Sequence, residues 1–293
     1  MLPHFPYRHP ARMLVPAFLL IITPVLSEGQ QTSRREIQRT DERELHVKLD
    51  ASFGTVYISR GSSDVIVMAE YTTDERDPEA FSLQYHRRGR SGELVIRAKE
   101  ESRFWKKSSD RDKRDRVWHL QFSDAIPITF SIELGAGRGD FDVSGLQVRK
   151  LKISSGASAV DLLCTTPNRI QAEDIVIESG VSKFTAVGLA NLNFRTMKFS
   201  GGVGAYQLDF GGTLRQDADV SIELGLGAVS IVIPRDTPTR LKYDDSWFSS
   251  LDLDDGFSRT RKGFYETESY RLADGSLNIQ IESGLGSVKV RVR

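Results

Sequence analysis

The chain has 293 residues, 39% of them apolar and 27% charged, so it can bury a core in one or two domains. Its 40 basic residues balance its 40 acidic residues, and this neutral charge gives no indication of a nucleic-acid-binding protein. The single cysteine, Cys164, excludes an intrachain disulfide. It follows Val160, Leu162 and Leu163 in an apolar stretch, which favours a small core residue over a reactive thiol.

Residues 1–27 have the pattern of a secretory signal peptide. Arg8, His9 and Arg12 form a basic start, an apolar run follows at 13–26, and small residues suit cleavage near Ser27. The run is shorter than the roughly 20 residues of a membrane span, although a retained anchor is the alternative. We therefore expect an exported protein, periplasmic or displayed at the cell surface, with no stable membrane span after signal cleavage.

The next stretch changes from polar to strand-like. Residues 28–43 lack apolar periodicity, which predicts a disordered lead. Alternating apolar residues then predict an N-terminal β-strand region at 44–126. Within it, the charged segment 99–117 contains Phe104 and Trp105. A solvated loop is the simpler interpretation, and a basic lip that meets an anionic surface is the alternative.

From residue 127 to the end of the chain one sequence motif recurs. In it, two segments of alternating apolar and polar residues flank a glycine turn. The first turn glycines are 21, 24, 22 and 23 residues apart, with a last copy 59 residues further on: Gly135, Gly156, Gly180, Gly202, Gly225 and Gly284. A period this steady is typical of a repeat architecture. Glycine can adopt the positive φ of a tight corner, so we expect these corners to stack.

The residues after each glycine predict which side of the strand faces inward. The residues four and six positions after it are apolar or small in every copy, and the residue between them is polar: Asp140, Asp161, Thr185, Gln207 and Ser230. The sequence thus predicts an all-β fold. We expect a β-solenoid with a single sheet on each face at 127–293. Such a fold is a β-helix-like stack, here of about 23-residue glycine-punctuated repeats.

The insert at 235–275 departs from the repeat. Aromatic residues gather there among acids, from Tyr243 to Tyr270. We expect these rings to plug an end of the solenoid, whose open edge would otherwise template aggregation, and an exposed aromatic binding patch is the alternative. After the insert, Val288, Val290 and Val292 alternate with basic residues, which we expect to protect a terminal edge.

Asp140 and Asp161 are the main candidates for a site. Stacked copies would bring these carboxylates to neighbouring coils, where they could hold a calcium ion or act as acid and base on a polysaccharide. The later residues of the row supply no third acid and no cation, which favours a solvated outer face. We therefore predict no catalytic, cofactor-binding or metal-binding residues, and no cofactor.

Other motifs are weaker. The glycine-rich turn at 135–140 precedes a strand, so no helix N-terminus is available to hold a phosphate, and its Arg-Gly-Asp triplet is short enough to arise by chance. The acidic segment 252–256 lacks the spacing of a calcium loop. The histidines outside the leader lie far apart without zinc-ligand spacing: His46, His86 and His119.

Segments 132–143, 221–242 and 263–292 carry a resemblance to known families. From Asp41 onward the chain resembles the toast-rack and LiaF-like C-terminal families of bacterial envelope proteins, and it is similar to the related family of putative adhesins. The resemblance implies a stacked β-solenoid outside the cytoplasm, linked in the LiaF-like case to responses to cell-wall damage. It carries over no catalytic residues, and this chain departs from the LiaF-like case in lacking the preceding transmembrane helices.

These features predict a non-enzymatic exported β-solenoid that serves as an interaction or scaffold module of the bacterial cell envelope. We expect it to take part in the envelope or cell-wall stress response. The expected partner is an envelope protein or a surface polymer, and no nucleic acid is expected. The alternative is a polysaccharide-binding or polysaccharide-cleaving β-helix protein that uses Asp140 and Asp161 or the aromatic residues from Tyr243 to Tyr270.

Overall fold

The computed structural model describes residues 20–21, 31–73, 81–98, 116–244, 249–272 and 275–293. The prediction of an all-β chain is confirmed. Strands dominate, and the residues so described contain no α-helix, only the short 3-10 helices η1 (Leu189–Leu192) and η2 (Glu268–Leu272). All the strands belong to one large mixed sheet that does not close on itself.

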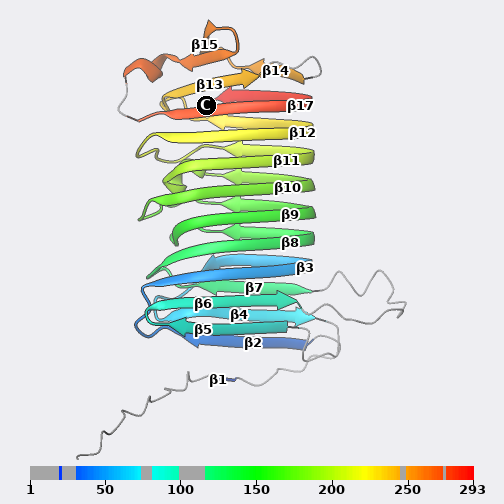
Figure 1. The fold of residues 1–293 in the computed structure, drawn as a ribbon, viewed down its shortest axis with the longest axis vertical. Helices are drawn as coiled ribbons and strands as arrows, with labels where there is room; N and C mark the ends of the chain where they lie inside the picture. Colours follow the sequence, from blue (N-terminus) through cyan, green and yellow to red (C-terminus); the bar gives the residue numbers. More distant parts are fainter. Residues whose placement is uncertain (1–19, 22–30, 74–80, 99–115, 245–248, 273–274) are drawn as a thin grey trace, which may run out of the picture.

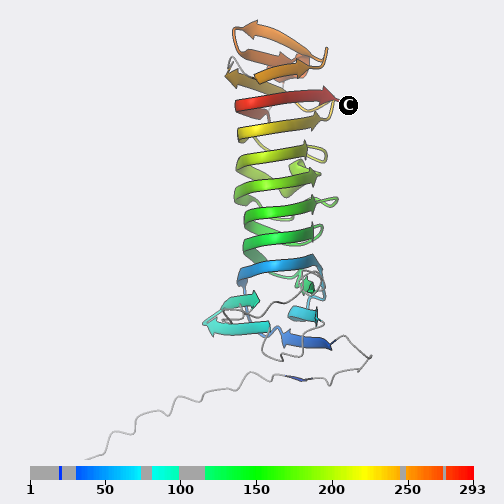
Figure 2. The ribbon, with the colours of Figure 1, turned by 90° about the vertical axis from the view of Figure 1, so that its right-hand side faces the viewer.

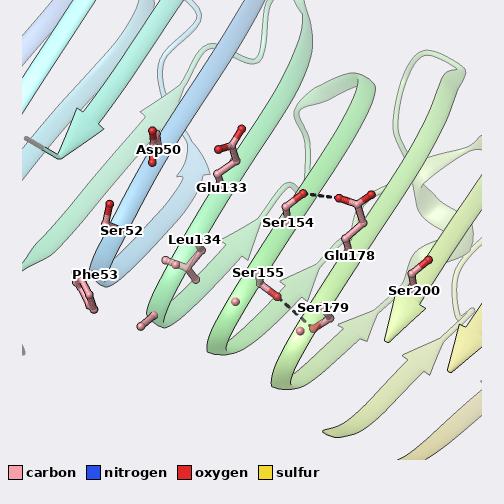
Figure 3. A pocket seen from close by; sticks show the side chains of 14 residues that line it. Asp50, Ser52, Phe53, Glu133, Leu134, Ser154, Ser155, Glu178, Ser179 and Ser200 are labelled. Carbon is pink, nitrogen blue, oxygen red and sulfur yellow. Dashed lines mark hydrogen bonds between the residues drawn. The ribbon is translucent and has the colours of Figure 1, made fainter. Parts of the chain in front are cut away.

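Seven long strands form the body of the molecule and lie one above the next along its longest axis (Figure 1). They are β3 (Glu44–Arg60), β8 (Pro127–Asp142), β9 (Gln147–Leu163), β10 (Ala172–Val187), β11 (Phe194–Asp209), β12 (Ala218–Ile233) and β17 (Leu277–Val292). Neighbours among them pair in parallel. Each strand bends at a corner and returns in a second layer (Figure 3), and Figure 2 views the stack from the side of these corners.

The register brings equivalent residues of successive strands into one row. Register partners are separated by 21, 24, 22 and 23 residues along the row Phe141, Leu162, Ala186, Leu208 and Ile231. All five side chains are buried in the same core cluster. The apolar alternation therefore places a continuous core between the two layers.

The corner glycines are required by close approach and not by a positive φ. A Cβ on Gly202 would lie 2.8 Å from the carbonyl oxygen of Gly180, and a Cβ on Gly225 would lie 2.8 Å from that of Gly202. Positive φ occurs instead two residues after the corner glycine, as at Gly137, where φ is 130°. The expectation of a positive φ at the corner glycines is therefore wrong, because the neighbouring carbonyl occupies the space of a side chain.

Shorter strands close the N-terminal end of the stack. The first half of β3 pairs in parallel with β6 and its second half with β7, so two short strands replace one bent strand. β5 and β6 form a hairpin, with Gly89 at its turn. The short strands are β2 (Gln31–Gln38), β4 (Val65–Thr73), β5 (Phe81–Arg88), β6 (Ser91–Ala98) and β7 (Val117–Phe122).

Strand β2 corrects the prediction of a disordered lead at 28–43. It pairs antiparallel with β4 from Gln31 to Gln38. Its buried side chain is Ile37, and most of its other residues are polar. Backbone pairing with β4 therefore defines this strand. Such pairing does not require the apolar periodicity on which the sequence prediction was based.

Strand β17 lies inside the stack. It pairs on one side with β12 and on the other with β13 and β14. The expectation that the last strand forms a terminal edge is therefore wrong, because strands of the insert at 235–275 cover it. These strands are β13 (Thr239–Asp244), β14 (Ser249–Leu253), β15 (Phe257–Arg261) and β16 (Phe264–Thr267).

Two predicted features fall mainly outside the described residues. Of the predicted leader, 1–27, the structure describes only Leu20 and Ile21, which form β1 and pair with β2. Residues 99–115 of the charged segment 99–117 lie outside the described residues, and they include Phe104 and Trp105. Within the described ranges no helix is long and apolar enough to cross a membrane.

Candidate functional site

Asp140 and Asp161 are register partners on β8 and β9, as the sequence predicts. The guanidinium of Arg138 lies near both carboxylates, with Nη2 3.1 Å from Asp161 Oδ2 and 3.9 Å from Asp140 Oδ2. The later residues of the row supply no cation, as the sequence indicates, but Arg138 supplies one from outside the row. It lies two residues before Asp140 on the same strand face.

This arrangement is an exposed ion triad on the outer face of the stack. Its three side chains are 42% to 55% exposed, so the contacts are screened by solvent. The guanidinium offsets the negative charge that would attract a calcium ion. Neither carboxylate lines either of the two grooves described below. Arg138 and Asp140 of the Arg-Gly-Asp triplet are members of this triad.

The remaining metal-site candidates stay apart. In the part of the chain that the structure describes, no three His, Cys, Asp or Glu side chains are grouped to hold a metal ion. A hydrogen bond from Arg291 lowers the pKa of Asp252, and Asp254 Oδ1 accepts a hydrogen bond from the Gly256 backbone. The histidines lie on three different strands, with His46 on β3, His86 on β5 and His119 on β7.

Aromatic side chains of the insert at 235–275 cover the C-terminal end of the stack. Tyr243 and Phe257 are buried. Two further rings lie beneath guanidinium groups, Phe264 under Arg261 at 3.8 Å and Tyr270 under Arg240 at 4.4 Å. Trp247 and Phe248 are outside the described residues. The described rings are thus packed or covered, which favours the plug over the exposed aromatic patch.

A groove of about 620 Å³ lies beside this insert, between the sheet face and Phe264. Its charged side chains have protein partners. Thr196 Oγ1 donates to Asp174 at 2.9 Å, Asn278 Nδ2 donates to Asp219 at 3.3 Å, and Arg240 Nε donates to Glu266 at 2.9 Å. The first two contacts lie within the stack and the third lies within the insert, so these polar groups of the groove already have partners.

A second groove runs along the glycine corners, and a polar row forms its first wall. The row contains acids and serines that are register partners from strand to strand: Asp50, Glu133, Ser154, Glu178, Ser200, Glu223, Glu282 and Asp244. Figure 3 shows its first members side by side on the outer face. Each of those on a long strand stands two positions before the corner, so alternation turns its side chain outward.

An exposed apolar row runs beside the polar row, at the tip of the corners, and its first members, Phe53 and Ala136, line the groove itself. Its members are Phe53, Ala136, Ala157, Val181, Val203, Leu226 and Leu285, again register partners. Among the described residues six large apolar side chains are exposed, and five of them stand in this row, with Val187 as the sixth. At a strand spacing of about 4.8 Å the row is about 29 Å long.

The corner glycines form the floor between these two rows. We call this groove the corner trough and define it by the polar row, the glycine row and the apolar row. One part, of about 790 Å³, extends from Asp50 to Ser200, and a second, of about 840 Å³, continues from Ser200 to Gly284. Since a Cβ would clash with the next carbonyl at these glycines, no side chain can fill the trough.

The charge along the corner trough has one sign. Its described lining residues include six carboxylates and no lysine, arginine or histidine. Lysines pair with these carboxylates from further along the strand, away from the corner: Lys48 with Glu133 at 3.7 Å, Lys152 with Glu178 at 3.5 Å and Lys198 with Glu223 at 2.7 Å. A hydrogen bond from Ser154, together with the charge of Lys152, lowers the pKa of Glu178.

The glycine corners were predicted from the sequence, but the trough beside them was not. Its signal was present in the aligned copies. Two positions before the corner glycine the copies carry an acid or a serine, and one position after it they carry alanine, valine or leucine. The apolar residue one position after the glycine departs from the inward alternation, and that departure could have indicated an exposed row.

Two sequence families match the chain. Residues 26–186 match the family described as the N-terminal domain of toast_rack, which covers more than half of the chain. The chain belongs to the toast-rack family. Residues 185–290 of this toast-rack protein match the family described as "Cell wall-active antibiotics response LiaF, C-terminal". Both resemblances stated from the sequence are thus confirmed.

Several solved structures are similar to the toast-rack protein at low identity. A "putative cell adhesion protein" from Clostridium sporogenes is 16% identical with a TM-score of 0.47, over 90% of this chain and 100% of that chain. A "putative adhesin" from Bacteroides fragilis is 13% identical with a TM-score of 0.41, over 89% and 97%. None of the curated proteins that were compared matches the chain.

Proposed function

We propose that this toast-rack protein is a non-enzymatic interaction module of the bacterial cell envelope. Its scaffold is a β-solenoid of about 23-residue coils, and its interaction surface is the corner trough. The observation that carries the proposal is the exposed apolar row, since a contiguous apolar row on a soluble protein marks an interaction site. Five of its side chains are 42% to 66% exposed.

The proposed location is outside the cytoplasm, in the periplasm or at the cell surface. The signal-peptide pattern of residues 1–27 supports export. The presence of a single cysteine fits a module that is stabilised by its core and not by disulfides. The match to the LiaF C-terminal family supports a role in the response to cell-wall-active antibiotics.

The test is deletion of the gene in its bacterial host, followed by measurement of sensitivity to cell-wall-active antibiotics. We expect sensitivity to change, and we expect the wild-type gene to restore it. The double variant Val181→Ser with Leu226→Ser should fail to restore it, whereas Val187→Ser should succeed because Val187 is exposed outside the apolar row. Unchanged sensitivity after deletion would rule out the stress role, and full restoration by the double variant would rule out the trough.

A further inference from the structure

The corner trough combines three features that together specify a ligand chemistry. An exposed apolar row runs along one side, a row of carboxylates lines the other side, and the floor is bare backbone. An apolar wall favours aliphatic or aromatic groups. A carboxylate wall favours cations. A single ligand that satisfies both walls must therefore be amphipathic and positively charged.

The shape of the trough favours an elongated ligand. The apolar row extends for about 29 Å and the two parts of the groove join at Ser200. Glycines at Gly156, Gly180 and Gly202 leave the floor without side chains, so a chain can approach the backbone closely. A peptide in an extended conformation advances about 3.3 Å per residue, so roughly nine residues would span the trough.

The spacing of the carboxylates gives the period of such a peptide. Glu133, Glu178 and Glu223 stand on alternate strands, with Ser154 and Ser200 between them. Two strand spacings are about 9.6 Å. Three residues of a polyproline II chain advance about 9.3 Å and complete one turn, so side chains three residues apart point to the same side. Basic side chains at every third position would therefore meet successive glutamates.

We propose that the corner trough binds an extended cationic amphipathic peptide, with basic side chains on the polar row and apolar side chains on the apolar row. This proposal rests on the proposed function, because it names the partner of the same surface. Lysines of the protein contact the glutamates from the side away from the corner. The carboxylates therefore remain accessible to a ligand from the trough side.

Charge argues against two other occupants. A second copy of the chain would bring a further six carboxylates to the interface, and like charges there oppose association. An anionic membrane surface would be repelled by the same row, although the apolar row alone would suit it. A cationic peptide is the occupant that gains from both walls.

The experiment measures binding of a labelled peptide to the full chain by fluorescence anisotropy. The probe has about nine residues, with lysine at every third position and leucine beside each lysine. We expect it to bind, and to bind more weakly as salt increases. A peptide with glutamate in place of lysine should bind at least about tenfold more weakly. Equal binding of the two peptides would overturn the proposal.

Variants locate the site and have matched controls. Glu178→Gln with Glu223→Gln, and separately Val181→Ser with Leu226→Ser, should each weaken binding at least about fivefold. Glu173→Gln, on the same strand as Glu178 and also paired with a lysine, and Val187→Ser should leave binding unchanged. Circular dichroism and urea midpoints verify that each variant is folded. Loss of binding in the controls, or retention in both double variants, would overturn the assignment.

Failure of this proposal can be told apart from failure of the proposed function. If the peptide does not bind but the Val181→Ser, Leu226→Ser variant still fails to restore antibiotic sensitivity, the trough is functional and the ligand chemistry is wrong. Binding of the chain to anionic vesicles alone, or concentration-dependent dimerisation that Leu226→Ser abolishes, would likewise replace the peptide as occupant. If that variant restores sensitivity fully, the proposed function itself fails.

Discussion

Gly202 packs against Gly180 on the neighbouring coil, so closely that a Cβ on Gly202 would lie 2.8 Å from the Gly180 carbonyl oxygen. Strand pairing holds the backbone on both sides of this corner, at Ser179 and Val181, so the oxygen cannot move aside as a flexible side chain would. We expect Gly202→Val to lower the free energy of unfolding by about 2 kcal/mol or more. Because adjacent coils share a core, unfolding in urea should also become less cooperative.

Gly275→Ala is the control for this change. A Cβ on Gly275 would meet its nearest neighbours, atoms of Gln216, at 3.6 to 3.8 Å, which is ordinary van der Waals contact. We expect its urea midpoint to stay close to that of the wild type. A Gly202→Val protein with an unchanged urea midpoint would contradict the close stacking of the corners.

Asp161→Asn should have little effect on stability. The carboxylate lies 3.1 Å from the Arg138 guanidinium, but both side chains are about half exposed. Exposed ion pairs contribute up to about 1 kcal/mol and are screened by salt. We expect the free energy of unfolding in urea to change by less than about 1 kcal/mol. A loss of several kcal/mol would mean that the triad holds β8 and β9 together, which we do not expect.

Glu42 should make stability depend on pH. Its Oε2 accepts a hydrogen bond from the Thr40 backbone at 2.7 Å, and its Oε1 accepts one from the Tyr85 hydroxyl at 2.8 Å. Burial raises the pKa of this carboxyl group, but these hydrogen bonds outweigh burial and the net pKa is lowered below 4.5. A lowered pKa in the folded state stabilises the protein above the unfolded pKa, and this contribution is lost as pH falls through the folded pKa.

Glu42→Gln therefore has a pH signature. At neutral pH we expect a loss of about 1 kcal/mol in the free energy of unfolding, because hydrogen bonds to a charged group are lost. The difference from the wild type should shrink as pH falls from about 5 through the lowered folded pKa of Glu42. Urea unfolding across this range measures it, with the exposed Glu93→Gln as the control. A difference that is constant with pH would contradict the prediction.

Cys164 should be unreactive in the folded protein. The side chain is buried, and burial, with a smaller effect of the Asp142 charge, raises the pKa of its thiol to about 12. The thiolate is the reactive form, so a thiol reagent at about pH 8 should modify the native protein at least about a hundredfold more slowly than the urea-unfolded protein. Equal rates in the two states would show that this thiol is accessible.

The sequence contained most of what defines the stack. The spacing of Gly135, Gly156, Gly180 and Gly202 equals the separation of register partners, because each corner must lie over the next. The inward placement of Phe141 and Leu162 followed from alternation. Both inferences depend on local pattern, which is the information that a single sequence carries.

The remaining features depend on contacts between distant segments. The position of β17 between β12 and β13 could not be inferred, since a gap of 59 residues does not show on which side the insert lies. The cation near Asp161 was missed because Arg138 stands two residues before Asp140, outside the row of equivalent positions that the repeat suggests. The corner trough was missed because its rows stand at outward positions next to the corner glycines, whereas the prediction followed the inward positions four and six residues after them.

The internal position of β17 affects how the molecule can form during synthesis. The ribosome delivers residues at about 5 to 20 per second, and β12 keeps an unpaired edge until residues 277–293 have emerged. Strands β13 and β14 are made earlier but must wait for that same segment as their neighbour. Loss of the last residues would consequently open a gap between β12 and β13 and leave the edge of β12 unpaired. An exposed strand edge of this kind is prone to pair with another chain.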